Sequence, residues 1–193
     1  AGLWVTLTDR SGNPMRPRFV VEPFKVLSMV RDHNGLGWGL LLEFCDPDGR
    51  THRVVVPNVA MKKDGAEALG ILMDRGCVPC RGTDLFLLEF LRRERPKTRA
   101  RITDRTGWHE SGAFVLPTEA IGEEDEHVLF LTDAPGAHQF KKKGTADQWR
   151  DQVGALCAGN SRLVFGVSAA LAAPLLHLAG AEGGGFHYRG GSS

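Results

Sequence analysis

The last eight residues of the sequence, FHYRGGSS, have the residue types that begin a phosphate-binding loop. A P-loop consists of a strand, then G-x-x-x-x-G-K-[ST], then a helix, and its backbone N–H groups surround the phosphates. Phe186–Arg189 is predicted to form the strand, and the first loop positions are then Gly190, Gly191, Ser192 and Ser193. Because Gly-Gly-Ser-Ser is also typical of a flexible linker, spacing by itself leaves both interpretations open.

The densest positive cluster lies at residues 92–105, where Glu94 and Asp104 are the only acidic residues. Arg and Lys neutralise backbone phosphates, and an aromatic ring can stack on a base. Since Trp108 follows this cluster, the sequence predicts a contact with DNA, single-stranded rather than duplex. The alternative is a solvated helix end and linker, with Trp108 packed in the core. The predicted nucleic-acid-binding residues are Arg92, Arg93, Arg95, Lys97, Arg99, Arg101, Trp108, Lys141, Lys142 and Lys143.

Cysteine and histidine spacing gives weaker indications of chemistry. Cys77 and Cys80 have the C-x-x-C spacing of redox and metal motifs, but no second C-x-x-C or paired histidine motif completes a zinc site. Two ordinary thiols in a turn is the favoured interpretation, and redox or metal chemistry is the alternative. His109 adjoins Trp108, and we expect it to be packed and hydrogen-bonded rather than a catalytic base. No metal ligand is predicted.

Composition restricts the class of protein. The chain has 193 residues, of which 42% are hydrophobic and 24% charged, with a formal net charge of +1. These values indicate a folded soluble protein, and any nucleic-acid signal must be local. Four cysteines are few for this length and suit a reducing, cytoplasmic compartment. Leu163–Ala181 is apolar and long enough to span a bilayer, but it contains Pro174 and His177, which favour a buried helix.

The elements that must position these residues begin with strands. Asn34-Gly35 is a strong hairpin signal, and Asp46–Gly49 is a second turn, so the runs around them predict an antiparallel meander. Two helices follow: one over Asp64–Asp74 that stops at Gly76, and one that Thr83 caps. The predicted strands are Leu3–Thr8, Phe24–Arg31, Gly37–Cys45 and Thr51–Val56.

Composition changes at residues 92–101, where Pro96 ends the second helix and marks a predicted domain boundary. Thr145–Gln148 fits a capping box that opens a helix ending at Gly159 and Asn160. A longer apolar helix follows from Ser161, with a bend at Pro174. Short strands are predicted at residues 101–103, 113–116 and 128–131.

Short motifs occur in a fixed order along the chain: Thr106–His109, Phe114–Pro117, Gly159–Asn160, Arg162–Leu163, Pro174–Leu176, Gly185–His187 and Gly190–Ser193. Together with Phe24–Leu42, they resemble the family called domain of unknown function 927. That family occurs in helicase-like and primase-helicase-like ATPases of phages, plasmids and genomic islands. In its pattern, the Gly-x-Ser-Ser segment continues into Thr-Gly-Lys-Thr.

This resemblance implies that the chain ends inside the Walker A motif of a P-loop ATPase. It also implies that the Ala-rich helix after Asn160 packs beside the ATPase strand. The sequence departs from the pattern because it contains no P-loop lysine, no following hydroxyl, no Walker B acid and no arginine finger. Phosphoryl transfer depends on these groups, so no catalytic residue is predicted and we expect no ATP hydrolysis. The fragment is expected to have no cofactor, and ATP and Mg²⁺ belong to the full-length parent.

The sequence therefore predicts an α+β fold with a boundary at Pro96. Residues 1–96 form an antiparallel strand-rich lobe with two helices, and residues 97–193 form an α/β-like lobe in which the Ala-rich helix leads into the P-loop strand. The expected function is that of a non-catalytic N-terminal part of a mobile-element ATPase, which engages DNA or positions subunits during replication.

The expected partners are single-stranded DNA, the missing C-terminal ATPase domain and further copies of the parent in a ring, with no membrane. The alternative is a protein-interaction or regulatory module with no direct DNA contact. The low net charge and the acidic run Glu123–Glu126 favour that alternative.

Overall fold

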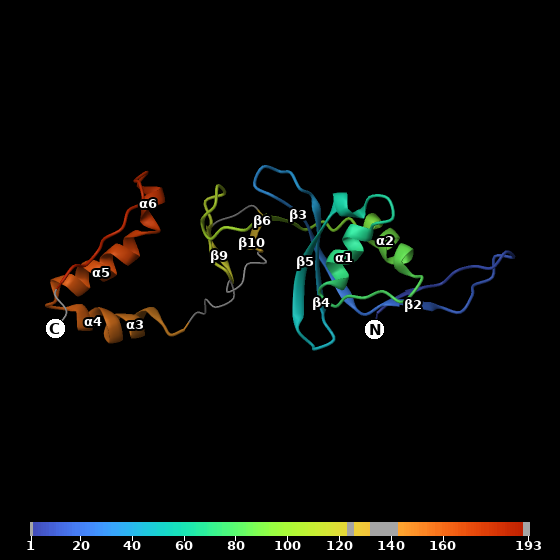
Figure 1. Ribbon diagram of the computed structural model, residues 1–193, viewed down its shortest axis with the longest axis horizontal. Coiled ribbons are helices and arrows are strands. Elements are labelled where there is room, and N and C mark those ends of the chain that lie inside the picture. Colours follow the sequence, from blue (N-terminus) through green and yellow to red (C-terminus); the bar gives the residue numbers. More distant parts are fainter. Residues whose placement is uncertain (1, 123–125, 132–142, 191–193) are drawn as a thin grey trace. The chain divides into compact units, whose positions relative to one another are not determined.

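The computed structural model describes residues 2–122, 126–131 and 143–190 (Figure 1). Its class is α+β, as predicted. The chain divides into two compact units: unit 1 comprises Ala1–Asp104 and Glu124–Leu131, and unit 2 comprises Arg105–Glu123 and Thr132–Ser193. The boundary therefore differs from the predicted one at Pro96. The reason is that the residues after Pro96 add a strand to the sheet of unit 1.

Unit 1 is built on a five-stranded mixed sheet in the order β10-β6-β3-β4-β5. The meander β3-β4-β5 is antiparallel, as predicted. The other two strands pair in parallel, β6 with β3 and β10 with β6, although the sequence placed both in the second lobe. The strands are β3 (Phe24–Arg31), β4 (Gly39–Cys45), β5 (Thr51–Pro57), β6 (Arg99–Thr103) and β10 (His127–Phe130).

Two α-helices and a 3₁₀ turn cover one face of this sheet (Figure 1). They are η1 (Asn58–Met61), α1 (Ala66–Met73) and α2 (Asp84–Arg93). The largest fully buried side chains in this layer alternate along the strands and recur along the helices, as expected for one shared core. They include Leu40, Leu42, Val56, Leu72, Leu87, Leu88 and Leu91.

The ends of both helices have local causes. After α1, Gly76 adopts φ 87°, and the N–H of Cys77 donates back to the carbonyl of Leu72, so the helix stops where predicted. Helix α2 begins after Thr83, but the Thr83 side chain makes no capping hydrogen bond. Its buried hydroxyl lies 2.7 Å from the carbonyl oxygen of Cys80, so it ties the preceding turn instead.

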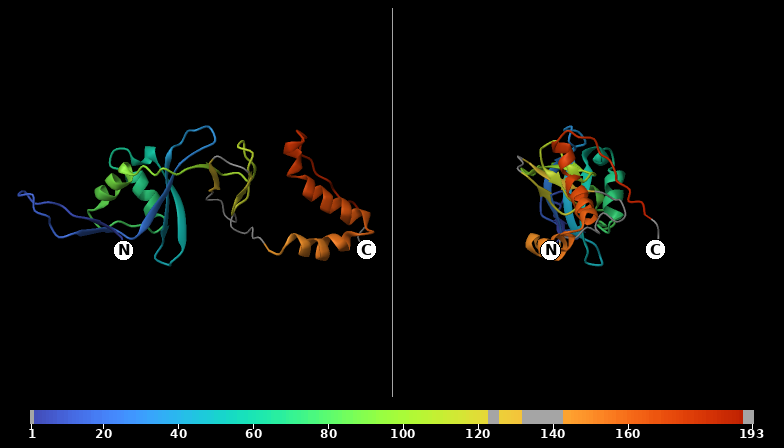
Figure 2. Two further views of the ribbon diagram at one scale, coloured as in Figure 1. Left: turned by 180° about the vertical axis from the view of Figure 1, so that it is seen from behind. Right: turned by 90° about the vertical axis from the view of Figure 1, so that its left-hand side faces the viewer.

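The N-terminal residues of unit 1 form a two-stranded antiparallel arm. Strand β1 (Leu3–Val5) pairs with β2 (Arg18–Val21), and a bridge between Thr8 and Pro14 continues the ladder. The arm extends beyond the sheet in Figures 1 and 2, where it is dark blue. Strand β1 ends at Val5 rather than at the predicted Thr8, because the hydrogen-bond ladder is interrupted after Val5.

Unit 2 contains a small antiparallel sheet in the order β7-β8-β9 and a series of helices. The predicted capping box is confirmed, because Thr145 and Gln148 exchange side-chain to backbone hydrogen bonds at the start of the first helix. The strands are β7 (Gly107–Trp108), β8 (Phe114–Val115) and β9 (Ala120–Ile121). The helical elements are α3 (Ala146–Trp149), the π-helical turn η3 (Arg150–Gly154), α4 (Ala155–Cys157), α5 (Ser161–Ala172) and α6 (Leu175–Leu178).

The Ala-rich segment differs from its prediction in burial. Asn160 caps α5 by accepting from the N–H of Leu163, and the chain breaks at Pro174 before α6. No residue of either described helix is buried, and Leu171 and Leu178 are 58% and 62% exposed. The expected buried helix is therefore not found among the described residues, because the contacts that α5 and α6 make there leave most of their leucines exposed. None of the helices in the described ranges is both long and apolar enough to cross a bilayer.

The predicted strand at Phe186–Arg189 is not assigned in the structure. Strand formation requires a neighbouring strand to exchange backbone hydrogen bonds. Here the aromatic side chains pack on α5 instead: the Phe186 ring lies 4.8 Å from that of Phe165, and the Tyr188 hydroxyl donates to the carbonyl of Arg162.

Candidate nucleic-acid interface

The predicted basic cluster does not form one continuous surface. Arg92 is half-buried and holds η1 against α2 through its guanidinium. Its Nε lies 3.0 Å from the carbonyl oxygen of Met61, and its Nη2 lies 2.6 Å from that of Lys63. Charge-assisted bonds of this kind stabilise a fold, so the role of Arg92 in the structure is internal.

The next residues of the cluster, Arg93, Arg95 and Lys97, are exposed, and the two arginines also have bonding partners in the chain. Arg93 is exposed on α2 and lies 2.7 Å from Glu89, one turn earlier. Arg95 donates to the carbonyls of Arg92 and Glu94, and Lys97 is exposed.

Arg99 and Arg101 lie on β6, where the parallel pairing with β3 adds a third arginine. In the register of this pair, Arg101 stands beside Arg31 and Arg99 beside Met29. Residues i and i+2 of a strand share a face, so the three arginine side chains are on the same side of the sheet. Strands β3 and β6, which are distant in sequence, thus bring three arginines together, although neither strand contains all three.

The ring of Trp38 lies close to two of these arginines. It is half-buried in the connection between β3 and β4. The guanidinium carbons of Arg31 and Arg99 lie 5.0 and 5.5 Å from the centre of its ring. Such contacts between a cation and an aromatic ring hold both partners in place. Trp38 therefore orients the two guanidinium groups.

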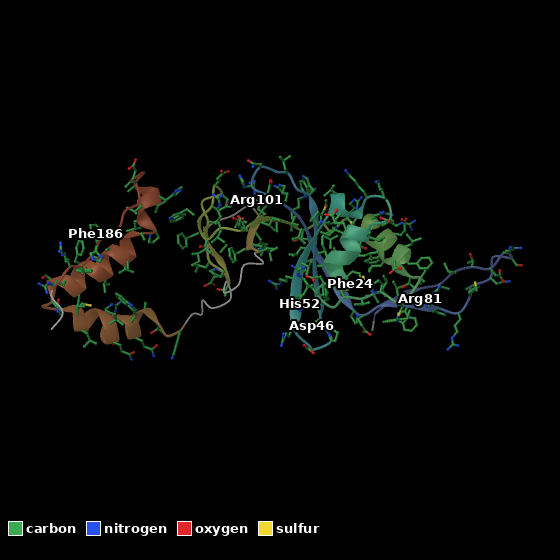
Figure 3. The ribbon with its side chains drawn as sticks, in the orientation of Figure 1. Phe24, Asp46, His52, Arg81, Arg101 and Phe186 are labelled. Carbon is green, nitrogen blue, oxygen red and sulfur yellow. The ribbon has the colours of Figure 1, made fainter. Side chains whose placement is uncertain are left out.

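One acidic side chain meets this group. Oε2 of Glu126 lies 2.6 Å from Nη2 of Arg31 and 3.5 Å from Nε of Arg101. The hydrogen bond from Arg31 holds the pKa of the Glu126 carboxyl below its usual value. Arg101 also donates to the carbonyl of His33, which places it beside the β3–β4 connection (Figure 3). We call Arg31, Trp38, Arg99, Arg101 and Glu126 the arginine–tryptophan site.

The charge of the arginine–tryptophan site suits an anionic ligand. The site has three guanidinium groups and one carboxylate, which pairs with Arg31 and Arg101, whereas Arg99 is exposed. Nη1 of Arg31 is buried and has no hydrogen-bond partner among the described residues. Guanidinium donors match the oxygens of phosphates, and a ring beside them is common in sites for nucleic acid.

The site includes two of the residues predicted from sequence, Arg99 and Arg101. Arg31 and Trp38 were missed, because Arg31 is a single arginine, followed by Asp32, at the end of a largely apolar strand, and Trp38 lies in a glycine-rich turn. The available signal was the Asn-Gly hairpin, which places both residues at the same end of β3 and β4.

Trp108, the predicted stacking residue, belongs to unit 2 and has internal contacts. Its ring stacks on His177 at 6.1 Å and meets Phe114 edge-on at 5.3 Å. Its Nε1–H donates to the carbonyl oxygen of Pro174 at 2.5 Å. Residues of three sequence motifs thus come together around one packed indole. Its neighbour His109 has Nδ1 at 2.9 Å from the hydroxyl of Ser111.

The remaining predicted residues belong to the lysine run of the nucleic-acid-binding set and to the partial P-loop. Lys143 and Gly190 are described and exposed. The other members of these two predicted sets lie outside the described residues, so their positions stay predictions. They are Lys141, Lys142, Gly191, Ser192 and Ser193.

The C-x-x-C pair is divided between the core and the surface. Cys77 is buried, and burial raises the pKa of its thiol to about 11, which disfavours the nucleophilic thiolate. Cys80 is exposed. Within the ranges that the structure describes, no three His, Cys, Asp or Glu side chains are arranged to hold a metal ion.

The fold and the site define an α+β protein in which three arginines are grouped on one face of a mixed sheet. The chain matches, over residues 1–193, the family described as domain of unknown function (DUF927), and it belongs to that family. A comparison with curated proteins gave no significant match.

Proposed function

We propose that this chain is the non-catalytic N-terminal part of a helicase-like P-loop ATPase of a mobile genetic element, and that it contacts single-stranded DNA during replication. The ATPase context is supported by the ordered motifs of the sequence, which resemble those of helicase-like proteins. Because phosphoryl transfer needs a P-loop lysine and bound Mg²⁺, residues 1–193 by themselves are expected to hydrolyse no ATP.

The observation that carries the DNA contact is the grouping of three arginines from two adjacent strands, two of which lie over the ring of Trp38. Neutralisation of DNA phosphates by arginine does not depend on the base sequence, which suits a protein that moves along DNA. Arg99 is exposed and its guanidinium is already oriented by the indole, so little side-chain freedom remains to be lost on binding.

The test is the salt dependence of binding to a fluorescent oligothymidylate, measured by anisotropy with the wild-type chain and two variants. Arg99→Ala removes an exposed arginine of the site. Arg93→Ala is the matched control, because it removes an exposed arginine that pairs with Glu89 on α2. We expect Arg99→Ala to weaken binding and to reduce the slope of log K against log salt by about 0.7.

Arg93→Ala should leave both quantities near their wild-type values. The proposal fails if the wild-type chain does not bind the oligonucleotide, or if the two variants have the same slope. A result in which Arg93→Ala has the larger effect would move the contact from the site to the outer face of α2.

A second candidate is a protein-interaction module, and a separate observation favours it. Leu171, Leu175 and Leu178 of α5 and α6 are more than half exposed. Apolar surface of this kind is usually covered by another protein surface. The expected partner is the ATPase domain of the parent, and co-expression with that domain should protect these helices from proteolysis. Equal cleavage rates with and without the domain would remove this candidate.

A further inference from the structure

We propose that Glu126 is an internal competitor for the arginine–tryptophan site, because its carboxylate occupies the position at Arg31 and Arg101 that a phosphate group of the ligand would take. The identity of the ligand, single-stranded DNA, rests on the proposed function. The competition itself concerns any phosphate-type anion, so the two can be tested separately.

The geometry of the ion pairs supports replacement by a phosphate. A single oxygen of Glu126, Oε2, serves both Arg31 and Arg101, at 2.6 and 3.5 Å. A phosphodiester has two non-bridging oxygens, so it can give each guanidinium an acceptor of its own. The buried Nη1 of Arg31 has no partner in the described part of the chain, so the same guanidinium has a donor left for a further acceptor.

The burial of the arginines shows what Glu126 blocks. The Arg31 side chain is 14% exposed and that of Arg101 is 31% exposed, whereas Arg99 is exposed. A phosphate can therefore reach Arg99 first, with Glu126 in place. Contact with Arg31 requires the carboxylate to leave, after which three positive charges face the ligand instead of a net two.

Glu126 can move without disrupting the sheet. It directly precedes β10, and the first residue of that strand paired with β6 is His127, opposite Ala100. No backbone ladder bond of β10 depends on the Glu126 side chain. Displacement would therefore cost the ion pairs and leave the strand pairing unchanged.

The experiment compares Glu126→Gln with Glu43→Gln in the full chain. Glu43 is a matched control because it also lies in unit 1 and pairs with two cations, Arg53 at 3.0 Å and Lys25 at 3.6 Å. Both substitutions change the net charge equally. Binding of an oligothymidylate and of inorganic tripolyphosphate is measured over a range of salt concentrations.

We expect Glu126→Gln to bind both anions several-fold more tightly than Glu43→Gln does. For the oligonucleotide its salt slope should be steeper by about 0.7 for each phosphate gained. Equal affinities for the two variants would overturn the competition. Tighter tripolyphosphate binding by Glu126→Gln with no oligonucleotide binding by any chain would support the competition and reject the DNA function. Oligonucleotide binding by the wild-type chain without any gain of affinity in Glu126→Gln would support the DNA function and reject the competition.

A second variant separates position from charge and guards against a folding defect. Glu126→Asp keeps the negative charge but shortens the side chain, so the carboxylate should reach Arg31 less well. Its anion affinity is expected between those of the wild-type chain and Glu126→Gln, with thermal unfolding close to wild type. An affinity equal to that of wild type would show that charge, rather than occupation of the site, is what matters, and would overturn the proposal.

Discussion

The two units of this chain differ in where their apolar side chains go. In unit 1, Leu72, Leu88 and Val56 are fully buried between the sheet and its helices. In unit 2, α5 and α6 have no buried residue, and Leu178 is 62% exposed. Burial of one such side chain contributes about 1.5–3 kcal/mol. Unit 1 is therefore held by its own core, whereas α5 and α6 obtain little stabilisation from the described chain.

The largest expected effect comes from separating the two regions. A fragment of residues 1–131 keeps the whole sheet of unit 1 and should unfold in one cooperative transition. A fragment of residues 143–190 holds only short helices, and α5 has 12 residues, which is marginal for a helix without packing. Circular dichroism during heating should show a sigmoidal transition for the first fragment and a gradual, non-cooperative change for the second.

The same experiment includes a fragment of residues 1–96, which tests the boundary predicted at Pro96. It lacks β6 and β10 and exposes the edge of β3, so it should be poorly soluble or unfolded. Cooperative folding of 1–96, or of 143–190, would break the contrast between the two units.

Single leucine substitutions should show the contrast at smaller scale. Leu88→Ala removes a side chain buried between α2 and the sheet, and it should lower the free energy of unfolding by about 2–5 kcal/mol. Leu171→Ala removes a side chain that is 58% exposed, and its effect should stay below about 0.5 kcal/mol. Urea denaturation of the full chain measures both, and equal effects would show that α5 is covered in solution.

Two neighbouring arginines of α2 should have unequal effects on stability. Arg92→Ala removes bonds to the carbonyls of Met61 and Lys63, and it should cost about 1.5–3 kcal/mol. Arg93→Ala breaks an exposed pair with Glu89, which contributes at most about 1 kcal/mol. Chemical denaturation gives the difference. Loss of DNA binding in Arg92→Ala without loss of stability would reverse the assignment of Arg92 as structural.

The smallest expected effect is a pH dependence in the core of unit 1. Burial raises the pKa of Cys77 to about 11, so the folded state favours the neutral thiol. This contribution is complete below the ordinary thiol pKa, about 8.5, and decreases as pH rises through about 11. Cys77→Ala lacks the titrating group, so its stability deficit relative to wild type should narrow over that range. Cys80→Ala, at an exposed site, serves as the control and should follow the wild-type profile.

Local sequence signals predicted the elements whose hydrogen bonds are short-range. Strand β3 begins and ends at Phe24 and Arg31 as expected, and the capping box at Thr145 is present. The same approach failed for Phe186–Arg189, which has the residue types of a strand but packs its aromatic rings on α5. A strand needs a partner, and no local pattern identifies one.

The amino-acid sequence by itself determined the family, the antiparallel meander and its turns, both helices of unit 1 and the presence of excess positive charge near residue 100. Only the tertiary structure decided which arginines lie together. The parallel pairing of β6 with β3 brings Arg101 beside Arg31, and the hairpin brings the ring of Trp38 close to Arg31 and Arg99. Arg99 and Arg101 lie far from Arg31 and Trp38 in the chain. The contacts of the site follow from the order of the strands in the sheet. That order depends on how the whole sheet buries its apolar side chains, and not on the residues of the site.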